Sequence, residues 1–106
     1  MEISDDKKIQ LLYRVEPGCL GPTGAQTIER FCEYANQHLT APYFAIYHFT
    51  PRFDKTKAEC EYSINARLLS AQQVQTYLTH FKTTRDEFEE QLDELLTQAI
   101  ETFLER

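Results

Sequence analysis

A chain of 106 residues is long enough for one domain with a hydrophobic core of its own, without disulfide or metal cross-links. Its hydrophobic fraction of 42% and charged fraction of 26% are those of an ordinary globular protein, and we expect a single domain over 1–106. The first residues are acidic where a signal peptide would be basic, and no apolar run reaches the roughly 18 residues of a membrane span. We therefore expect a cytoplasmic protein with no membrane segment.

The net charge of −6 is concentrated at the C-terminal end. Residues 1–85 carry ten basic and nine acidic side chains, whereas residues 86–106 carry one basic and eight acidic. Phosphate groups would repel such a segment, so the imbalance disfavours its contact with DNA, RNA or an anionic membrane. A basic protein partner would suit it.

The cysteines and histidines show no metal-binding pattern. The chain has an odd number of cysteines and no CxxC pair, so we expect reduced thiols at all three: Cys19, Cys32 and Cys60. The three histidines fall on different expected elements: His38, His48 and His80. No metal or other cofactor is predicted.

The first half of the chain predicts a strand, a helix and a second strand. Apolar residues alternate with polar ones over 8–15, which is typical of a strand with one buried face. A helical apolar stripe follows, with a capping-box pattern at Thr23 and Gln26 and an end near Thr40. Residues 43–49 are apolar on both sides, which favours a strand covered on both faces.

The second half predicts a third strand and two helices. Residues 58–68 alternate most regularly of all, and we expect this strand to form a hairpin with the second. Capping-box patterns at Ser70 with Gln73, and at Thr84 with Glu87, each precede a helical apolar stripe. Residues 70–106 could form one kinked helix, but we favour two helices with a break around 82–84.

The element order predicts a two-layer α+β domain, β-α-β-β-α-α, with a three-stranded, mainly antiparallel sheet and helices on one face. A right-handed crossover from the first strand to the second would leave room for the third between them, in a split βαβ arrangement of order 1-3-2. This resembles a ferredoxin-like fold without its last strand. Because such a sheet has open edges and a bare face, we expect a homodimer.

The loop EPGCLGPTG at 16–24 has three interpretations. Glycine and proline are what a tight turn between a strand and a helix requires. Alternatively, the following helix N-terminus binds an anion or another ligand, at Gly18, Gly21, Thr23 and Gly24. In the third interpretation Cys19 is a catalytic or redox thiol whose thiolate is favoured by the helix dipole. The GxxGxxG spacing matches neither the dinucleotide nor the Walker fingerprint, which favours the turn.

Two charged segments are candidates for partner binding. The polar connection TPRFDKTK at 50–57 surrounds an aromatic residue with cations, as interface anchors often are: Arg52, Phe53 and Lys55. The last predicted helix carries closely spaced carboxylates: Glu87, Glu90, Asp93 and Glu94. Either segment could equally be a solvated surface.

Nucleic-acid binding on the bare sheet face is disfavoured. It would need outward cations at Lys8, Arg14 and Arg67 and an outward aromatic ring at Phe44 or Tyr47. Glu59 and Glu61 would repel phosphate there.

These patterns predict a small, non-catalytic binding or regulatory domain that acts through protein contacts. Its expected surfaces are the acidic C-terminal helix and the basic loop 50–57, which would be the tip of the expected hairpin, and its expected partner is a protein with a basic surface. The alternative is an enzyme or an anion-binding protein built around the loop 16–24, with Cys19 as the reactive group.

Overall fold

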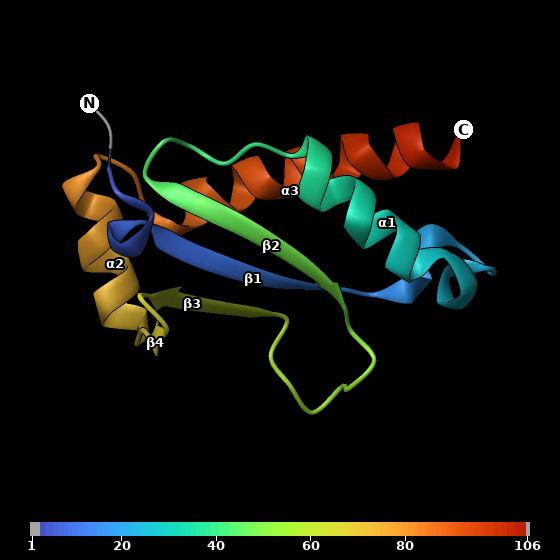
Figure 1. Ribbon diagram of the computed structural model, residues 1–106, viewed down its shortest axis with the longest axis horizontal. Coiled ribbons are helices and arrows are strands. Elements are labelled where there is room, and N and C mark those ends of the chain that lie inside the picture. Colours follow the sequence, from blue (N-terminus) through green and yellow to red (C-terminus); the bar gives the residue numbers. More distant parts are fainter. Residues whose placement is uncertain (1–2, 106) are drawn as a thin grey trace.

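Three helices and a four-stranded mixed sheet make up the fold (Figure 1). The structure is a computed structural model, and it describes residues 3–105. In chain order the strands and helices are β1 (Ile9–Val15), α1 (Gly24–His38), β2 (Ala45–Pro51), β3 (Cys60–Ile64), β4 (Arg67–Leu68), α2 (Ala71–His80) and α3 (Arg85–Leu104). Short 3-10 helices lie at Asp5–Lys7 and Pro17–Leu20. The expected α+β class is confirmed.

The strand order is β2-β1-β3-β4, so the predicted order 1-3-2 is wrong. β1 lies between its two partners, parallel to β2 and antiparallel to β3. The expected hairpin of the second and third strands does not form, and the sheet is neither three-stranded nor the split βαβ unit of a ferredoxin-like fold. Local alternation identifies a strand but does not say which strand it pairs with, because pairing depends on contacts distant in the sequence.

A long connection makes the observed order possible. Residues 52–59 leave β2 and cross beneath the C-terminal end of β1 before β3 begins (Figure 1). Arg14 of β1 holds the end of this crossing, since its Nη1 donates to the Ala58 carbonyl at 2.6 Å and its Nη2 pairs with Glu61 at 2.9 Å. At the start of the crossing, the Arg52 amide donates to the Val15 carbonyl. Both strands therefore pair with β1 instead of with each other.

The predicted strand 58–68 reverses at Asn65 and Ala66. Both residues have positive φ angles, 50° and 67°, and the chain returns as the two-residue strand β4. Two successive left-handed residues are the geometry of a type I′ hairpin turn, which normally carries glycine. Asn65 is the only turn-forming residue there, so the alternating pattern concealed the reversal.

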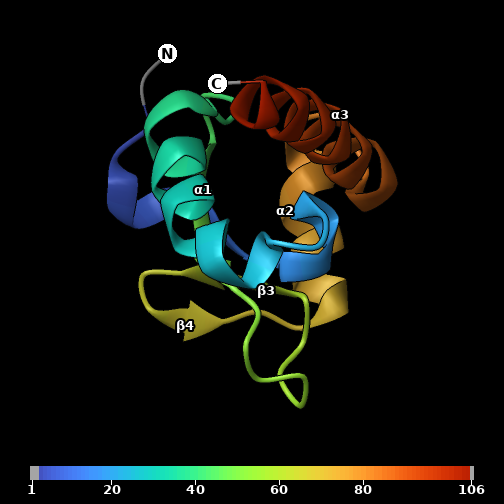
Figure 2. The same ribbon diagram turned by 90° about the vertical axis from the view of Figure 1, so that its right-hand side faces the viewer.

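α1 and α3 cover one face of the sheet, as expected, whereas α2, which was expected on the same face, packs at the end of the sheet (Figures 1 and 2). No helix of residues 3–105 lies on the other face (Figure 2). Tyr77 attaches α2 to the sheet, because its hydroxyl accepts from the Ile9 amide at 3.2 Å and donates to the Phe44 carbonyl at 2.9 Å. A two-layer arrangement results, with the core between the sheet and the two long helices.

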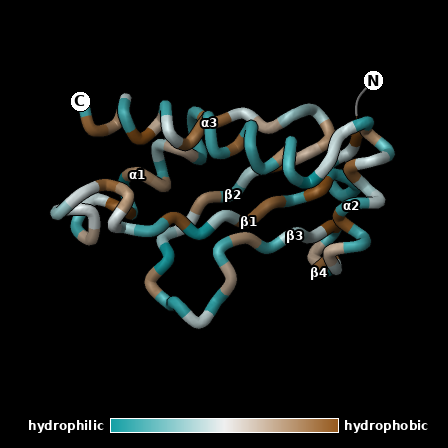
Figure 3. The backbone as a smooth tube through the Cα atoms, turned by 180° about the vertical axis from the view of Figure 1, so that it is seen from behind, coloured by the Kyte–Doolittle hydropathy of each residue, from teal (hydrophilic) through white to brown (hydrophobic). Residues whose placement is uncertain are grey.

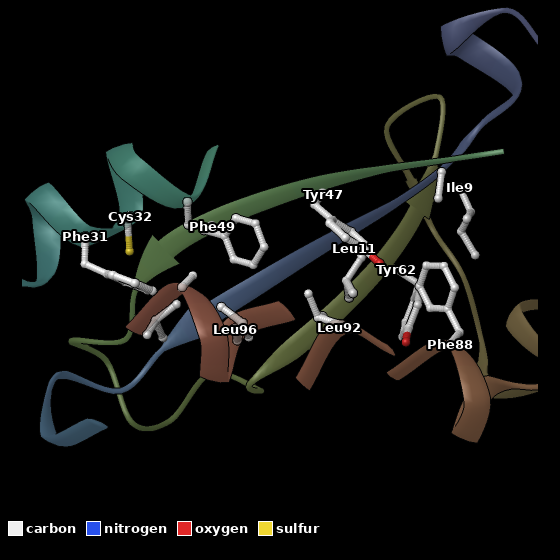
Figure 4. Packing of buried hydrophobic residues seen from close by; sticks show 14 of the residues in the cluster. Ile9, Leu11, Phe31, Cys32, Tyr47, Phe49, Tyr62, Phe88, Leu92 and Leu96 are labelled. Carbon is white, nitrogen blue, oxygen red and sulfur yellow. The ribbon is translucent and has the colours of Figure 1, made fainter. Parts of the chain in front are cut away.

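The core is rich in aromatic rings (Figure 4). Phe88 of α3 is fully buried. Its ring packs against three aromatic rings on the sheet side of the core: Phe44, Tyr47 and Tyr62. The inward residues of β1, β2 and β3 alternate with outward ones, as the strand period requires.

The expected break between the last two helices is present. α2 ends at His80 with Lys82 at φ 63°, and the Thr83 amide returns to the Leu78 carbonyl while the Lys82 amide donates to Thr79. These two bonds are those of a Schellman motif, which satisfies the last carbonyls of a helix and turns the chain away. The Ser70–Gln73 capping box is formed in both directions. At Thr84 only half of the box forms: its hydroxyl oxygen accepts from the Glu87 amide, but the Glu87 carboxylate bonds to the Thr84 hydroxyl and not to the Thr84 amide.

Candidate functional site

The loop 16–24 has a structural explanation at two of its glycines. A Cβ atom built on Gly24 would lie 1.7 Å from the Pro17 carbonyl oxygen, so only glycine fits there. Gly21 has a φ of 88°, which side chains rarely adopt, whereas Gly18 has open space around it. The close approach at Gly24 is therefore to the protein's own backbone.

The helix N-terminus beside this loop differs from the predicted one. Thr23 precedes α1, but its side chain caps no amide, so the expected Thr23–Gln26 capping box is absent. The amides of Gly24 and Gln26 donate to carbonyls of the preceding turn, those of Gly21 and Thr23. Anion binding at Gly18, Gly21, Thr23 and Gly24 stays a prediction.

The cysteines lie in three different environments. Cys19 is exposed in the 3-10 turn, and no hydrogen bond joins its sulfur to a histidine within residues 3–105. Burial raises the pKa of the Cys32 thiol to about 11 and that of Cys60 to about 12. Because the thiolate is the nucleophile, Cys32 and Cys60 are poorly reactive near neutral pH.

The basic loop and the glycine-rich loop meet at Glu16. Arg52 Nη1 lies 2.8 Å from one carboxylate oxygen of Glu16, and Lys55 Nζ pairs with the other. The hydrogen bonds from Lys55 and from Arg52 lower the pKa of Glu16. Two of the three residues predicted for partner binding in this loop are thus occupied inside the molecule, while Phe53 is 61% exposed.

A pocket of about 300 Å³ lies under this loop on the helix-free face of the sheet. The outward side chains of Leu12, Arg14 and Thr50 line it together with Phe53 and Lys57 of the loop. Arg14 is only 9% exposed and already holds Ala58 and Glu61, so its role there is to anchor the loop.

The aromatic platform considered for a nucleic acid is absent. Phe44 and Tyr47 are both buried on the helix side of the sheet, so neither can stack on a base. β2 instead presents Ile46, His48 and Thr50 to the helix-free face. The expectation that residues 43–49 form a strand covered on both faces was wrong, because α1 and α3 cover only the face of β2 that carries its buried residues, and His48 on the other face is exposed (Figures 1 and 2).

The acidic residues of α3 are exposed. Glu87, Glu90, Asp93 and Glu94 lie on the outer side of the helix, and none of them forms an ion pair in the described part of the chain. Hydrophilic and hydrophobic stretches alternate along α3, as one apolar stripe on an otherwise polar helix requires (Figure 3). Four carboxylates therefore face solvent without compensation; we call them the acidic face.

Glu89, one residue away from the acidic face, behaves differently. Its Oε2 accepts from the Tyr62 hydroxyl at 2.5 Å and from Arg85 Nε at 2.9 Å, and the Arg85 guanidinium lies 5.4 Å from the Tyr62 ring centre. Burial, and then the bond to Glu89, raise the pKa of Tyr62. Sequence reasoning missed this cluster, although the spacing of four between Arg85 and Glu89 indicates a helical ion pair.

A groove of about 360 Å³ runs beside the acidic face. It lies between the connection from α1 to β2 and the middle of α3, and Glu94 belongs both to this groove and to the acidic face. The sequence contains no motif that would have identified it, because its two sides are about fifty positions apart.

Within residues 3–105 there is no group of three or more metal-ligating side chains, and no helix is long and apolar enough to cross a membrane. A scan against protein-family models finds no match for the chain, and neither a curated protein nor a solved structure is similar to it. The function must therefore be inferred from the geometry.

Proposed function

We propose that this protein is a small, non-catalytic binding domain whose acidic face on α3 recognises a basic surface of a protein partner. The observation that carries the proposal is the contrast between its two charged surfaces. Arg52 and Lys55 are both paired internally with Glu16, whereas the four carboxylates of the acidic face have no ion-pair partner among the described residues.

Repulsion among the unpaired carboxylates of α3 lowers the stability of the protein on its own. This supports a role for them in binding a partner. Glu87, Glu90 and Glu94 recur at intervals of three and four, so they are neighbours that repel one another on the helix surface. A basic surface would relieve this repulsion and would be steered toward the face over a distance of about one Debye length.

The decisive experiment compares capture of partners by two variants of equal net charge. The first neutralises the acidic face through Glu87→Gln, Glu90→Gln, Asp93→Asn and Glu94→Gln. The second, the matched control, neutralises four exposed carboxylates elsewhere, through Asp6→Asn, Glu29→Gln, Glu33→Gln and Glu59→Gln. Captured proteins from the source cells are quantified by mass spectrometry at two salt concentrations.

We expect the control to retain the partner that the wild-type protein captures, and the acidic-face variant to lose it. The interaction should also weaken with salt, because exposed charges are screened. Equal capture by both variants would overturn the proposal, since position on α3 would then not matter.

A cytoplasmic homodimer remains part of the proposal. The described cysteines Cys19, Cys32 and Cys60 are all unpaired, which suits a reducing compartment. The helix-free sheet face offers a second copy of the chain a surface that does not compete with the acidic face.

A further inference from the structure

The groove beside the acidic face combines an apolar part with a polar one. Ala41, Pro42 and Leu95 contribute apolar surface, whereas Gln91, Glu94 and Gln98 contribute two amides and a carboxylate. Glu94 is its only charged residue, so the groove carries negative charge and no cation.

The polar residues come from one side of α3. Gln91, Glu94 and Gln98 are spaced by three and four, which places them in one row along the helix. Each offers a side-chain oxygen as a hydrogen-bond acceptor. Tyr47 also lines the groove; it is 8% exposed, and its hydroxyl has no hydrogen-bond partner in the described structure.

We infer that the groove receives the side chain of a lysine or arginine of the basic partner, a step that rests on the proposed function. These side chains have an apolar stem that matches Ala41, Pro42 and Leu95, and a cationic end that matches Glu94 and its flanking amides. A volume of about 360 Å³ is at the lower end of ligand pockets, which suits one long side chain better than a cofactor.

Other occupants fit less well. An apolar side chain would shield Glu94 from water without replacing its hydrogen bonds, which is unfavourable. An anion would meet the field of Glu94 and of the neighbouring acidic face. The groove is thus the point at which long-range attraction becomes a specific contact.

The test is a titration followed by NMR, with three capped peptides as probes. Each contains three copies of one residue alternating with glycine: lysine, arginine or acetyl-lysine. We expect the lysine and arginine peptides to shift the backbone signals of Ala41 and Leu95 and the side-chain amides of Gln91 and Gln98. The acetyl-lysine peptide, which has the stem without the charge, should leave them unchanged.

A pair of variants with equal charge tests the position. Gln98→Glu adds a carboxylate to the groove, whereas Thr102→Glu adds the same charge one turn further along α3, outside the residues that line it. Gln98→Glu should tighten binding of the lysine peptide about two- to fivefold, and Thr102→Glu should tighten it less than Gln98→Glu does. Glu94→Gln should weaken binding about fivefold.

The failure of this inference can be told apart from failure of the proposed function. A variant with Glu87→Gln, Glu90→Gln and Asp93→Asn keeps Glu94 and the groove intact. The proposed function stands and the groove inference is overturned by three results together. This variant no longer binds the lysine peptide, the NMR signals of the groove residues do not shift in the wild-type protein, and Gln98→Glu and Thr102→Glu bind the peptide equally tightly. If this variant binds the peptide as the wild-type protein does, the proposed function fails.

Discussion

Single atoms decide which glycine of the loop 16–24 is indispensable. A Cβ atom on Gly24 would lie 1.7 Å from the Pro17 carbonyl oxygen, so Gly24→Ala must push two backbone segments apart. We expect it to lower the free energy of unfolding by about 3 kcal/mol or more. Gly18→Ala, with open space around it, should change stability by less than about 0.5 kcal/mol. Urea denaturation measures both; equal losses would mean that the turn yields without cost.

Two buried phenols of the core should respond to the same substitution with opposite signs. The Tyr47 hydroxyl is buried without a partner in the described structure, and burial raises the pKa of Tyr47 to about 12, whereas the Tyr62 hydroxyl donates to Glu89. An unsatisfied hydroxyl costs about 1–3 kcal/mol, so Tyr47→Phe should stabilise the protein by about 1 kcal/mol. Tyr62→Phe should destabilise it by a similar amount. Thermal unfolding gives both values, and destabilisation by Tyr47→Phe would contradict the assignment.

At the scale of elements, the helices were predictable because their signals are local. The apolar stripes, the Ser70–Gln73 capping box and the break after α2 all depend on residues within one or two turns of each other. The end of β3 was not predictable, because alternation continues through Asn65 and Ala66 without a glycine to indicate a turn.

The candidate site divides in the same way. Exposure of the acidic face follows from the helical stripe, so its four carboxylates could be placed from the sequence. The pairing of Glu16 with Arg52 and Lys55 could not, because it depends on β1 and β2 being parallel neighbours with Val15 opposite Pro51, which sets Glu16 beside Arg52. The groove likewise requires the packing of α3 against the connection before β2.

The end of α2 provides a test of element termination. Lys82 holds a left-handed conformation, which costs a residue with a Cβ about 1–2 kcal/mol. Glycine avoids this cost, but part of the gain is lost because glycine has more conformational entropy in the unfolded state. Lys82→Gly should therefore stabilise the protein by about 0.5–1 kcal/mol. Lys82→Ala removes the same charge but keeps the Cβ, so chemical denaturation should show no gain for it. Equal gains would attribute the effect to charge instead.

At the scale of the whole molecule, both edges of the sheet are protected against pairing. β4 has only two residues, and on β2 the Asn36 side chain imitates a neighbouring strand: its Nδ2 donates to the Phe49 carbonyl at 2.9 Å, and its Oδ1 accepts from the Phe49 amide at 2.7 Å. Short strands and covered backbone groups are the usual means of preventing edge-to-edge association. The expected homodimer would then have to use the helix-free face.

Asn36→Ala should expose the edge of β2. The Phe49 amide and carbonyl lose their partner, so we expect a loss of about 1 kcal/mol in stability and new association that increases with protein concentration. Gln37→Ala, an exposed neighbour on α1, is the matched control and should leave the assembly state unchanged. Sedimentation equilibrium over a hundredfold concentration range distinguishes them. If both variants have the stability and assembly state of the wild-type protein, water replaces the hydrogen bonds from Asn36 to the Phe49 backbone without cost. The shape of α1, and not the Asn36 amide, would then prevent other chains from pairing with the edge of β2.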